Sequence, residues 1–355
     1  MPRTSAEPAL RFLSENSLLD RGFDLKSQGQ TVSIPLSRQL EGAEVDMLRS
    51  KVEGTILGQD EFEPRTVLPR TLEEALAGDI PAESLARLPG SFDIVGDIAV
   101  LEFSSNMFEY EEKIANAVLE IHSNVKAVFA RTGPTSGSER IRPLRHVAGE
   151  DRTETLHREF GCTFKLDLSK VFFSPRLSTE HDRVARQVVE GEQVIDMFSG
   201  AGPFSILIAK RLKDVRVDAI DSNPAAIKLL EENTRANKVD SKIRAHLGDA
   251  RQVANRLGHT ATRVIMNHPS AAKEFVGAAC HVLSTFGGKV HYYTFAGGDD
   301  AELGAKREME TALEASNHSI RRLLGVRRVR EVAPVKWQIA IDAEVTPDSP
   351  PKSRL

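Results

Sequence analysis

The run at residues 194–205, Val-Ile-Asp-Met-Phe-Ser-Gly-Ala-Gly-Pro-Phe-Ser, constrains the fold more than any other segment. It opens with buried-type residues that are typical of a core strand, and Asp196 lies near the end of that strand. Gly200 and Gly202 then predict a tight turn into a helix, because glycine adopts backbone conformations that other residues avoid. A turn of this kind at the carboxyl end of a strand lets a ligand approach the backbone closely in an α/β sheet.

Strand and helix patterns alternate from about residue 160 onward. Strands are predicted at 194–197, 215–220, 243–247, 263–266, 290–295 and 337–345, and helices at 203–212 and 224–236. Asn223 is a good helix N-cap and Pro224 suits the first helical position. This alternation predicts an α/β fold with a mostly parallel, Rossmann-like sheet.

The residues before about 160 predict two smaller units. The first, at 9–50, combines a short helix with a half-buried strand around Val32. A polar linker at 58–70 separates it from an α+β module of short helices and strands. We therefore place the domains, in chain order, as a small N-terminal domain at 1–60, an α+β middle domain at 70–160, the Rossmann-like domain at 161–346 and a flexible tail at 347–355.

Composition excludes several classes of protein. The net charge of −4 does not suggest a strongly basic nucleic-acid binder, although 126–186 carries a local excess of Lys and Arg. No run of about 18 apolar residues predicts a membrane span, and the first thirty residues have no signal pattern, so we expect a cytoplasmic protein. Cys162 and Cys280 are too few for a disulfide framework or a thiolate zinc site, and no metal is predicted.

Polar residues follow four of the predicted strands. Asp221 ends the second strand, where it can accept hydrogen bonds from both hydroxyls of a ribose. Asp249, in Gly248-Asp249-Ala250, follows the third, and Asn267-His268-Pro269 follows the fourth. This pattern predicts a site for S-adenosylmethionine (AdoMet). An NAD-binding domain would explain the first two loops but not the last two, and Ser205 stands where it prefers a third glycine. The structural alternative is that each Asp at a strand end only caps a helix.

The loop after the fourth strand indicates what is methylated. An Asn-x-Pro at this place is typical of enzymes that methylate a planar nitrogen. A lactam nitrogen such as N1 of guanine also loses a proton, which requires a general base. Glu180, in the segment 170–183, is a candidate base, although Ser178-Thr179-Glu180 would also suit the start of a solvated helix.

Two arginine-rich segments have two interpretations each. Arg140 and Arg142 alternate on an extended segment and could present guanidinium groups to phosphates or to a base oxygen, or form an exposed strand edge. The run at 321–330 could follow an RNA backbone or be an ordinary solvated face.

Five motifs together resemble the archaeal and eukaryotic tRNA (guanine-N1)-methyltransferase family, a class I AdoMet-dependent family that acts on guanosine 37. They are Phe-Ser-Pro-Arg-Leu-Ser-Thr-Glu (173–180), Asp-Met-Phe-Ser-Gly-Ala-Gly-Pro-Phe (196–204), Ala-Ile-Asp-Ser-Asn-Pro (219–224), Gly-Asp-Ala-Arg (248–251) and Val-Ile-Met-Asn-His-Pro (264–269). The resemblance covers residues 85–345 well and the leading unit more weakly.

The resemblance implies three catalytic roles. Glu180 matches the family's general base, Arg140 its guanine-oxygen contact with Arg142 as the alternative register, and Asn267 its guanine and AdoMet contact. Two residues depart from the family pattern. His181 stands where the family often has an Arg near the AdoMet carboxylate, and His268 replaces a usual Leu.

The resemblance also implies the cofactor site and the partner. The expected AdoMet-binding residues are His181, Asp196, Phe198, Gly200, Gly202, Asp221, Ser222, Asp249, Ala250, Asn267 and Pro269. The expected partner is tRNA, held at its anticodon loop and outer corner by a monomeric enzyme. The alternatives are a related wybutosine-pathway aminocarboxypropyl transferase, a non-catalytic tRNA-binding protein and a small-molecule methyltransferase.

Overall fold

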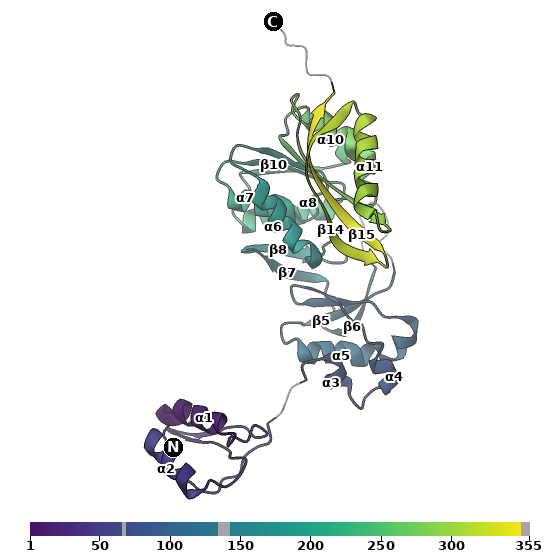
Figure 1. Ribbon diagram of the computed structural model, residues 1–355. Helices are drawn as coiled ribbons and strands as arrows, with labels where there is room; N and C mark the ends of the chain where they lie inside the picture. Colours follow the sequence, from purple (N-terminus) through teal and green to yellow (C-terminus); the bar gives the residue numbers. More distant parts are fainter. Residues whose placement is uncertain (66–68, 134–142, 349–355) are drawn as a thin grey trace. The chain divides into compact units, whose positions relative to one another are not determined.

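The computed structural model describes residues 1–65, 69–133 and 143–348. The chain divides into two compact units, Met1–Pro69 and Arg70–Leu355, drawn in Figure 1. No helix in these described ranges is long and apolar enough to cross a membrane.

The first unit is a small α+β fold around its own core. A 3-10 turn (Arg3–Ser5) leads into α1 (Ala6–Glu15), a hairpin of β1 (Lys26–Gln28) and β2 (Thr31–Ser33) follows, and α2 (Gly42–Lys51) completes it. Phe12, Leu13 and Leu48 lie in its buried core. The strand predicted around Val32 is β2, which is three residues long and buries Val32.

The second unit begins with a four-stranded sheet in the order β3-β4-β5-β6. Its elements are α3 (Leu72–Leu76), α4 (Ala82–Leu85), β3 (Asp93–Val95), β4 (Ile98–Leu101), η2 (Ser105–Tyr110), α5 (Glu111–Ile121), β5 (Ala127–Arg131) and β6 (Leu144–Gly149). Ile114 and Val118 of α5 are fully buried against this sheet, so the predicted amphipathic helix has the expected inner face.

A β-hairpin connects this module to the large sheet. It consists of β7 (Glu154–Glu159) and β8 (Cys162–Asp167), paired antiparallel. The predicted domain boundary between residues 160 and 161 falls in the turn of this hairpin, where Phe160 and Gly161 both have positive φ. The side chains of Asn233 and Asn237 hydrogen-bond to the backbone of β8 and fix the hairpin against the following fold.

The large sheet has seven strands in the order β11-β10-β9-β12-β13-β15-β14. The strands are β9 (Gln193–Asp196), β10 (Arg216–Asp221), β11 (Ile243–Leu247), β12 (Arg263–Met266), β13 (Gly288–Gly297), β14 (His318–Ala333) and β15 (Lys336–Pro347). The first five run parallel, β15 pairs antiparallel with β13, and β14 pairs antiparallel with β15. The α/β, Rossmann-like prediction is therefore confirmed.

Helices cover both faces of this sheet (Figure 1). They are η3 (Pro175–Leu177), α6 (Ser178–Gln187), α7 (Pro203–Arg211), α8 (Pro224–Ala236), α9 (Ala250–Leu257), η4 (Ala272–Phe275), α10 (Val276–Val282) and α11 (Ala301–Glu314). The strand order reverses direction between β9 and β12, and a crevice at the carboxyl ends of the strands is expected at such a reversal.

The arginine-rich run at 321–330 lies within β14, the edge strand of the sheet. The sequence gives no clear strand pattern there, because four register shifts against β15 interrupt the alternation of inward and outward side chains. The run therefore lies on an edge strand, and its contact with an RNA backbone stays a prediction beside the alternative of a solvated face.

Candidate functional site

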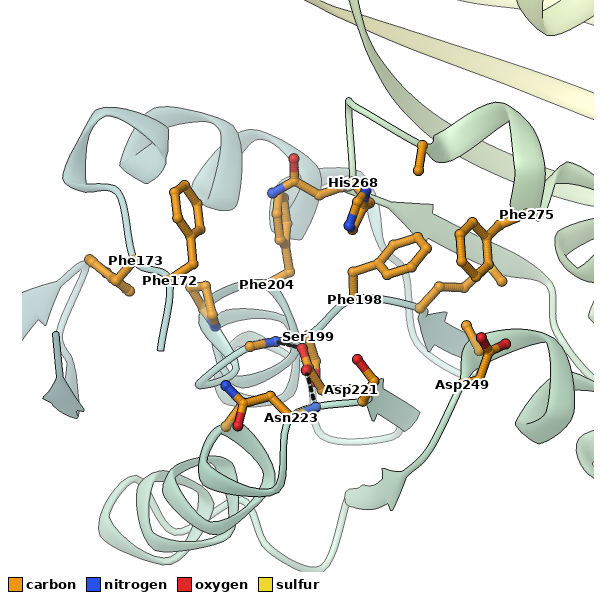
Figure 2. Close-up of a pocket in the computed structure, with 18 of the residues that line it drawn as sticks. Phe172, Phe173, Phe198, Ser199, Phe204, Asp221, Asn223, Asp249, His268 and Phe275 are labelled. Carbon is orange, nitrogen blue, oxygen red and sulfur yellow. Dashed lines mark hydrogen bonds between the residues drawn. The ribbon is translucent and has the colours of Figure 1, made fainter. Parts of the chain in front are cut away.

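A cavity of about 340 Å³ opens at the carboxyl ends of four neighbouring strands. Its walls come from the loops after β9, β10, β11 and β12 and from the segment that precedes α6, as Figure 2 shows. The volume lies in the range of small-molecule sites, roughly 300–1,000 Å³. Asp221, Asp249 and Asn267, which the sequence places at the ends of three strands, therefore line the same cavity.

The loop between β9 and α7 needs its two glycines for different reasons. Gly200 and Gly202 have φ of +54° and +94°. A Cβ at Gly202 would lie 2.4 Å from Leu230 Cδ1, whereas one at Gly200 would have Phe172 O as its nearest atom, at 3.8 Å. Gly200 lines the cavity and Gly202 does not belong to its lining. Gly202 therefore lets the helix pack, and Gly200 lets the backbone reach the cavity.

Asp221 links two walls of the cavity. Its carboxylate accepts hydrogen bonds from the backbone N–H of Gly200 at 2.8 Å and of Asn223 at 2.9 Å (Figure 2). Asn223 caps α8 through the N–H of Ala225, as predicted, and donates to the carbonyl of Lys170. The loops after β9 and β10 are thus fixed relative to each other, and Ser222 also lines the cavity.

Asp196 lies behind the cavity rather than in its lining. The side chain is fully buried, and its Oδ2 accepts a hydrogen bond from the Ser205 hydroxyl at 2.8 Å. Burial raises the pKa of Asp196 to about 7. Ser205, the position of the missing third glycine, therefore serves to hold this carboxylate beneath the glycine loop.

One wall of the cavity is aromatic. The Phe198 ring lies 4.9 Å from that of His268 and 4.9 Å from that of Phe275 (Figure 2). Arg251 stacks over Phe275 and pairs with Asp249, whose pKa it lowers. Ala250 completes the lining next to this pair. A flat, nitrogen-rich ring would find both stacking surfaces and an acceptor here.

Asn267 and Pro269 of the Asn-x-Pro segment differ in their contact with the cavity. Asn267 lines the cavity, and its Oδ1 accepts a hydrogen bond from Gln338 Nε2 at 3.3 Å. Pro269 does not belong to the lining, and its carbonyl accepts from the backbone N–H of Phe295 at 3.3 Å. Asn267 can therefore contact a ligand, while Pro269 shapes the loop.

The opposite wall holds His181 among phenylalanine rings. His181 lines the cavity, together with Phe172, Phe173 and Phe204. Its ring meets the Phe204 ring edge-on at 4.6 Å, and its Nδ1 lies 2.8 Å from Glu159 Oε2.

Glu180 is the neighbour of His181 in the first turn of α6 but lies outside the cavity lining. Its carboxylate accepts hydrogen bonds from Arg183, at 2.8 to 3.0 Å, and from the Tyr293 hydroxyl, at 2.9 Å. Arg183 in turn pairs with Asp342, and Asp342 accepts from His291. Glu180 is thus a buried, oriented carboxylate rather than the start of a solvated helix.

Two predicted residues have no described position. Arg140 and Arg142 both lie in the segment 134–142, outside the described residues. Within the described ranges, no group of three or more His, Cys, Asp or Glu side chains is placed to hold a metal ion.

The sequence analysis missed several residues of the site. Phe172 precedes the recognised motif at 173–180, Phe173 is its first residue but was given no role, and Phe275 lies in η4, which no pattern predicted. Glu159 and Asp342 are distant in sequence from the residues they contact, so no local spacing could reveal them.

Comparison with known families gives matches along most of the chain. Residues 155–321 match the TRM5/TYW2 methyltransferase domain, residues 72–153 the TYW2 N-terminal domain, and residues 1–44 the tRNA methyltransferase 5 N-terminal domain. The tRNA (guanine(37)-N(1))-methyltransferase Trm5b of Pyrococcus abyssi is 40% identical over 348 residues, which are 98% of each chain.

Comparison with solved structures gives matches to the same family. The complex of aTrm5 with tRNALeu matches with a TM-score of 0.74 and 31% identity over 97% of this chain and 98% of that one. P. horikoshii TYW2 in complex with MeSAdo matches with a TM-score of 0.66 and 27% identity over 78% of this chain and 98% of that one. The full-length similarity and the matched domains show that the chain belongs to the TRM5/TYW2 methyltransferase family.

Proposed function

We propose that this protein is an AdoMet-dependent tRNA methyltransferase that forms N1-methylguanosine at position 37, next to the anticodon. The observation that carries the proposal is the 40% identity, over 98% of both chains, to a protein named for this reaction. The cavity adds independent support, because its loops are the ones expected to hold a nucleoside-like methyl donor.

The residues present fit AdoMet. Asp221 is placed to accept from the ribose hydroxyls, and the wall of Phe198, His268 and Phe275 suits the adenine ring. Ser199 also lines the cavity, and its buried hydroxyl has no hydrogen-bond partner in the described structure. A buried polar group without a partner is costly, so a polar ligand would satisfy it. Bound AdoMet supplies a methyl group activated by its sulfonium.

The protein then positions the guanine and removes one proton. The N1 nitrogen forms a bond to the methyl carbon while the sulfur–carbon bond breaks, and the N1 proton must leave. We assign the proton to Glu180, whose carboxylate is held in one orientation by Arg183 and Tyr293. Asn267 would hold the guanine, and Arg140 would stabilise charge on its oxygen.

We propose that tRNA meets the protein at its anticodon loop and outer corner. The match of residues 1–44 to a tRNA methyltransferase 5 N-terminal domain supports an additional contact by the first unit. Arg321 and Arg322 are exposed on β14 and suit contacts with phosphates. The monomeric state and the cytoplasmic location stay predictions.

The main competing function is transfer of the aminocarboxypropyl group of AdoMet. The match of residues 72–153 to the TYW2 N-terminal domain is the observation that favours it. Retention of Asn267-x-Pro269 and the N-terminal match favour methyl transfer.

One experiment separates these functions. The purified protein is incubated with a tRNA transcript that carries G37 and with AdoMet, and the nucleosides are analysed by mass spectrometry. We expect a gain of one methyl group on guanosine. A gain of the larger group would establish the aminocarboxypropyl transferase. Salt-dependent tRNA binding without any transfer at saturating AdoMet would indicate a non-catalytic binder.

A further inference from the structure

Glu159 and His181 form a buried pair at the wall of the AdoMet cavity. Glu159 ends β7, and its side chain and that of His181 are each 2% exposed. Glu159 Oε2 lies 2.8 Å from His181 Nδ1. Because an ionised carboxylate only accepts hydrogen bonds, Nδ1 carries the proton of this contact. Nε2 is then the ring nitrogen available to a ligand in the cavity.

His157 lies beside the second oxygen of Glu159. The backbone N–H of Gly96 donates to His157 Nδ1 at 3.1 Å, so Nδ1 is the acceptor in this contact. The proton of His157 therefore sits on Nε2, which lies 3.7 Å from Glu159 Oε1. This distance is too long for a good hydrogen bond, and both atoms are buried without another partner in the described structure.

The two histidines affect the pKa of Glu159. Burial acts to raise the pKa of Glu159, but the contacts with His157 and His181 outweigh it and hold the pKa below its usual range. A buried carboxylate must be paired or hydrogen-bonded. In the described residues, the side chains placed to pair with Glu159 are these two histidines. Of the two, His181 is the one within good hydrogen-bond distance of the carboxylate.

The other charged groups of the cavity leave His181 a distinct role. Asp221 and Asp249 lie in the loops after β10 and β11, on the nucleoside side. Arg251 is already engaged with both oxygens of Asp249. Glu274, in η4, is a third carboxylate of the lining. His181 packs instead against Phe173 and Phe204. Its Nε2 is thus a polar atom on the side that remains for the amino-acid end of AdoMet.

We propose that Glu159 is a positioning residue that orients the His181 ring, so that His181 contacts Glu159 through Nδ1 and the carboxylate of AdoMet through Nε2. The proposal rests on the AdoMet site proposed above. It assigns the contact with that carboxylate to the histidine of a buried Glu–His pair, and it makes the affinity for AdoMet depend on a residue that lies behind the cavity wall.

The test compares two ligands that differ only in this carboxylate. Dissociation constants of AdoMet and of decarboxylated AdoMet are measured by calorimetry for the wild type, Glu159→Gln and His181→Gln. Glu159→Gln keeps the shape and the hydrogen-bond acceptor but removes the charge. We expect it to weaken AdoMet binding about tenfold, because a charge-assisted hydrogen bond becomes a neutral one or is lost. Decarboxylated AdoMet should lose little affinity.

Two further variants sharpen the result. His181→Gln should show the same loss confined to AdoMet, so the proposal can be tested even if one variant does not fold. In Glu159→Gln/His181→Arg, the permanent charge of Arg should restore the preference for AdoMet over its decarboxylated analogue. Circular dichroism melting confirms folding before each titration.

Three outcomes would overturn the proposal. Equal loss of affinity for both ligands would show that Glu159 only supports the fold of the cavity wall. Unchanged affinity of Glu159→Gln for AdoMet would show that Glu159 does not support the contact between His181 and the AdoMet carboxylate. If the wild type binds neither ligand, the AdoMet site itself is wrong, and this result is distinct from the first two.

Discussion

Replacement of Gly202 by alanine tests whether the glycine loop is built as the structure shows. The φ of +94° costs an alanine about 1–2 kcal/mol. The new Cβ would lie 2.4 Å from Leu230 Cδ1 and 3.0 Å from Ile206 Cδ1, both of residues that are fully buried. Such overpacking adds about 1–3 kcal/mol. Gly202→Ala should therefore lower the free energy of unfolding by about 2–5 kcal/mol.

Gly200→Ala is the matched control in the same loop. Its φ of +54° also disfavours alanine, but its Cβ would have no heavy atom nearer than 3.8 Å. The expected loss is therefore only the backbone cost, about 1–2 kcal/mol. Any larger effect of this variant should appear in AdoMet binding, because Gly200 lines the cavity and Gly202 does not.

The chain contains one tryptophan, Trp337, which lies in β15 of the large sheet. Its fluorescence during denaturant unfolding reports on that sheet, and a change in the midpoint at constant slope measures the change in stability. The reasoning would be refuted if Gly202→Ala were no less stable than Gly200→Ala.

Three further predictions concern charged side chains. Arg263 is fully buried and donates to both oxygens of Glu192, so Arg263→Met should cost about 3–5 kcal/mol in denaturant unfolding, and a loss below about 1 kcal/mol would contradict the pairing. Since burial raises the pKa of Asp196 from 3.8 to about 7, its contribution to stability is fully present below about pH 4 and is lost as the pH rises through about 7. The free energy of unfolding of Asp196→Asn should therefore rise relative to the wild type by up to about 4 kcal/mol as the pH increases from about 4 to 8. A difference in unfolding free energy that does not change with pH would be evidence against a neutral Asp196. Glu180→Gln should slow single-turnover methyl transfer at least about 100-fold with little change in AdoMet affinity, and Arg140→Ala should act likewise; a near-normal rate for Glu180→Gln would place the base elsewhere.

The strands and loops of the cofactor site could be predicted because each is encoded locally. A buried strand followed by Asp221 or by Asn267 gives both the element and its functional end, and parallel strands bring such ends to one edge. The cap at Asn223 and the start of α8 at Pro224 follow from the same short-range rules.

The remaining features depend on contacts between distant segments. Glu159 lies on a hairpin that no pattern predicted, and its contact with His181 exists only once that hairpin packs against α6 and α7. The environment of Glu180 likewise needs Tyr293 and Asp342 from two other strands. Three residues were expected to bind the cofactor but lie outside the cavity lining: Asp196, Gly202 and Pro269. Their direct contact with the cofactor stays a prediction.

Mapping the modified nucleotide tests the central claim most directly. The protein is incubated with AdoMet and transcripts that differ only in carrying guanosine or adenosine at position 37, with Asp221→Ala as the variant that should lose the methyl donor. The account predicts N1-methylguanosine at position 37 of the first transcript and none in the second transcript or with Asp221→Ala. Methylation at any other position, at another atom of guanosine 37, or equally well by Asp221→Ala would contradict it.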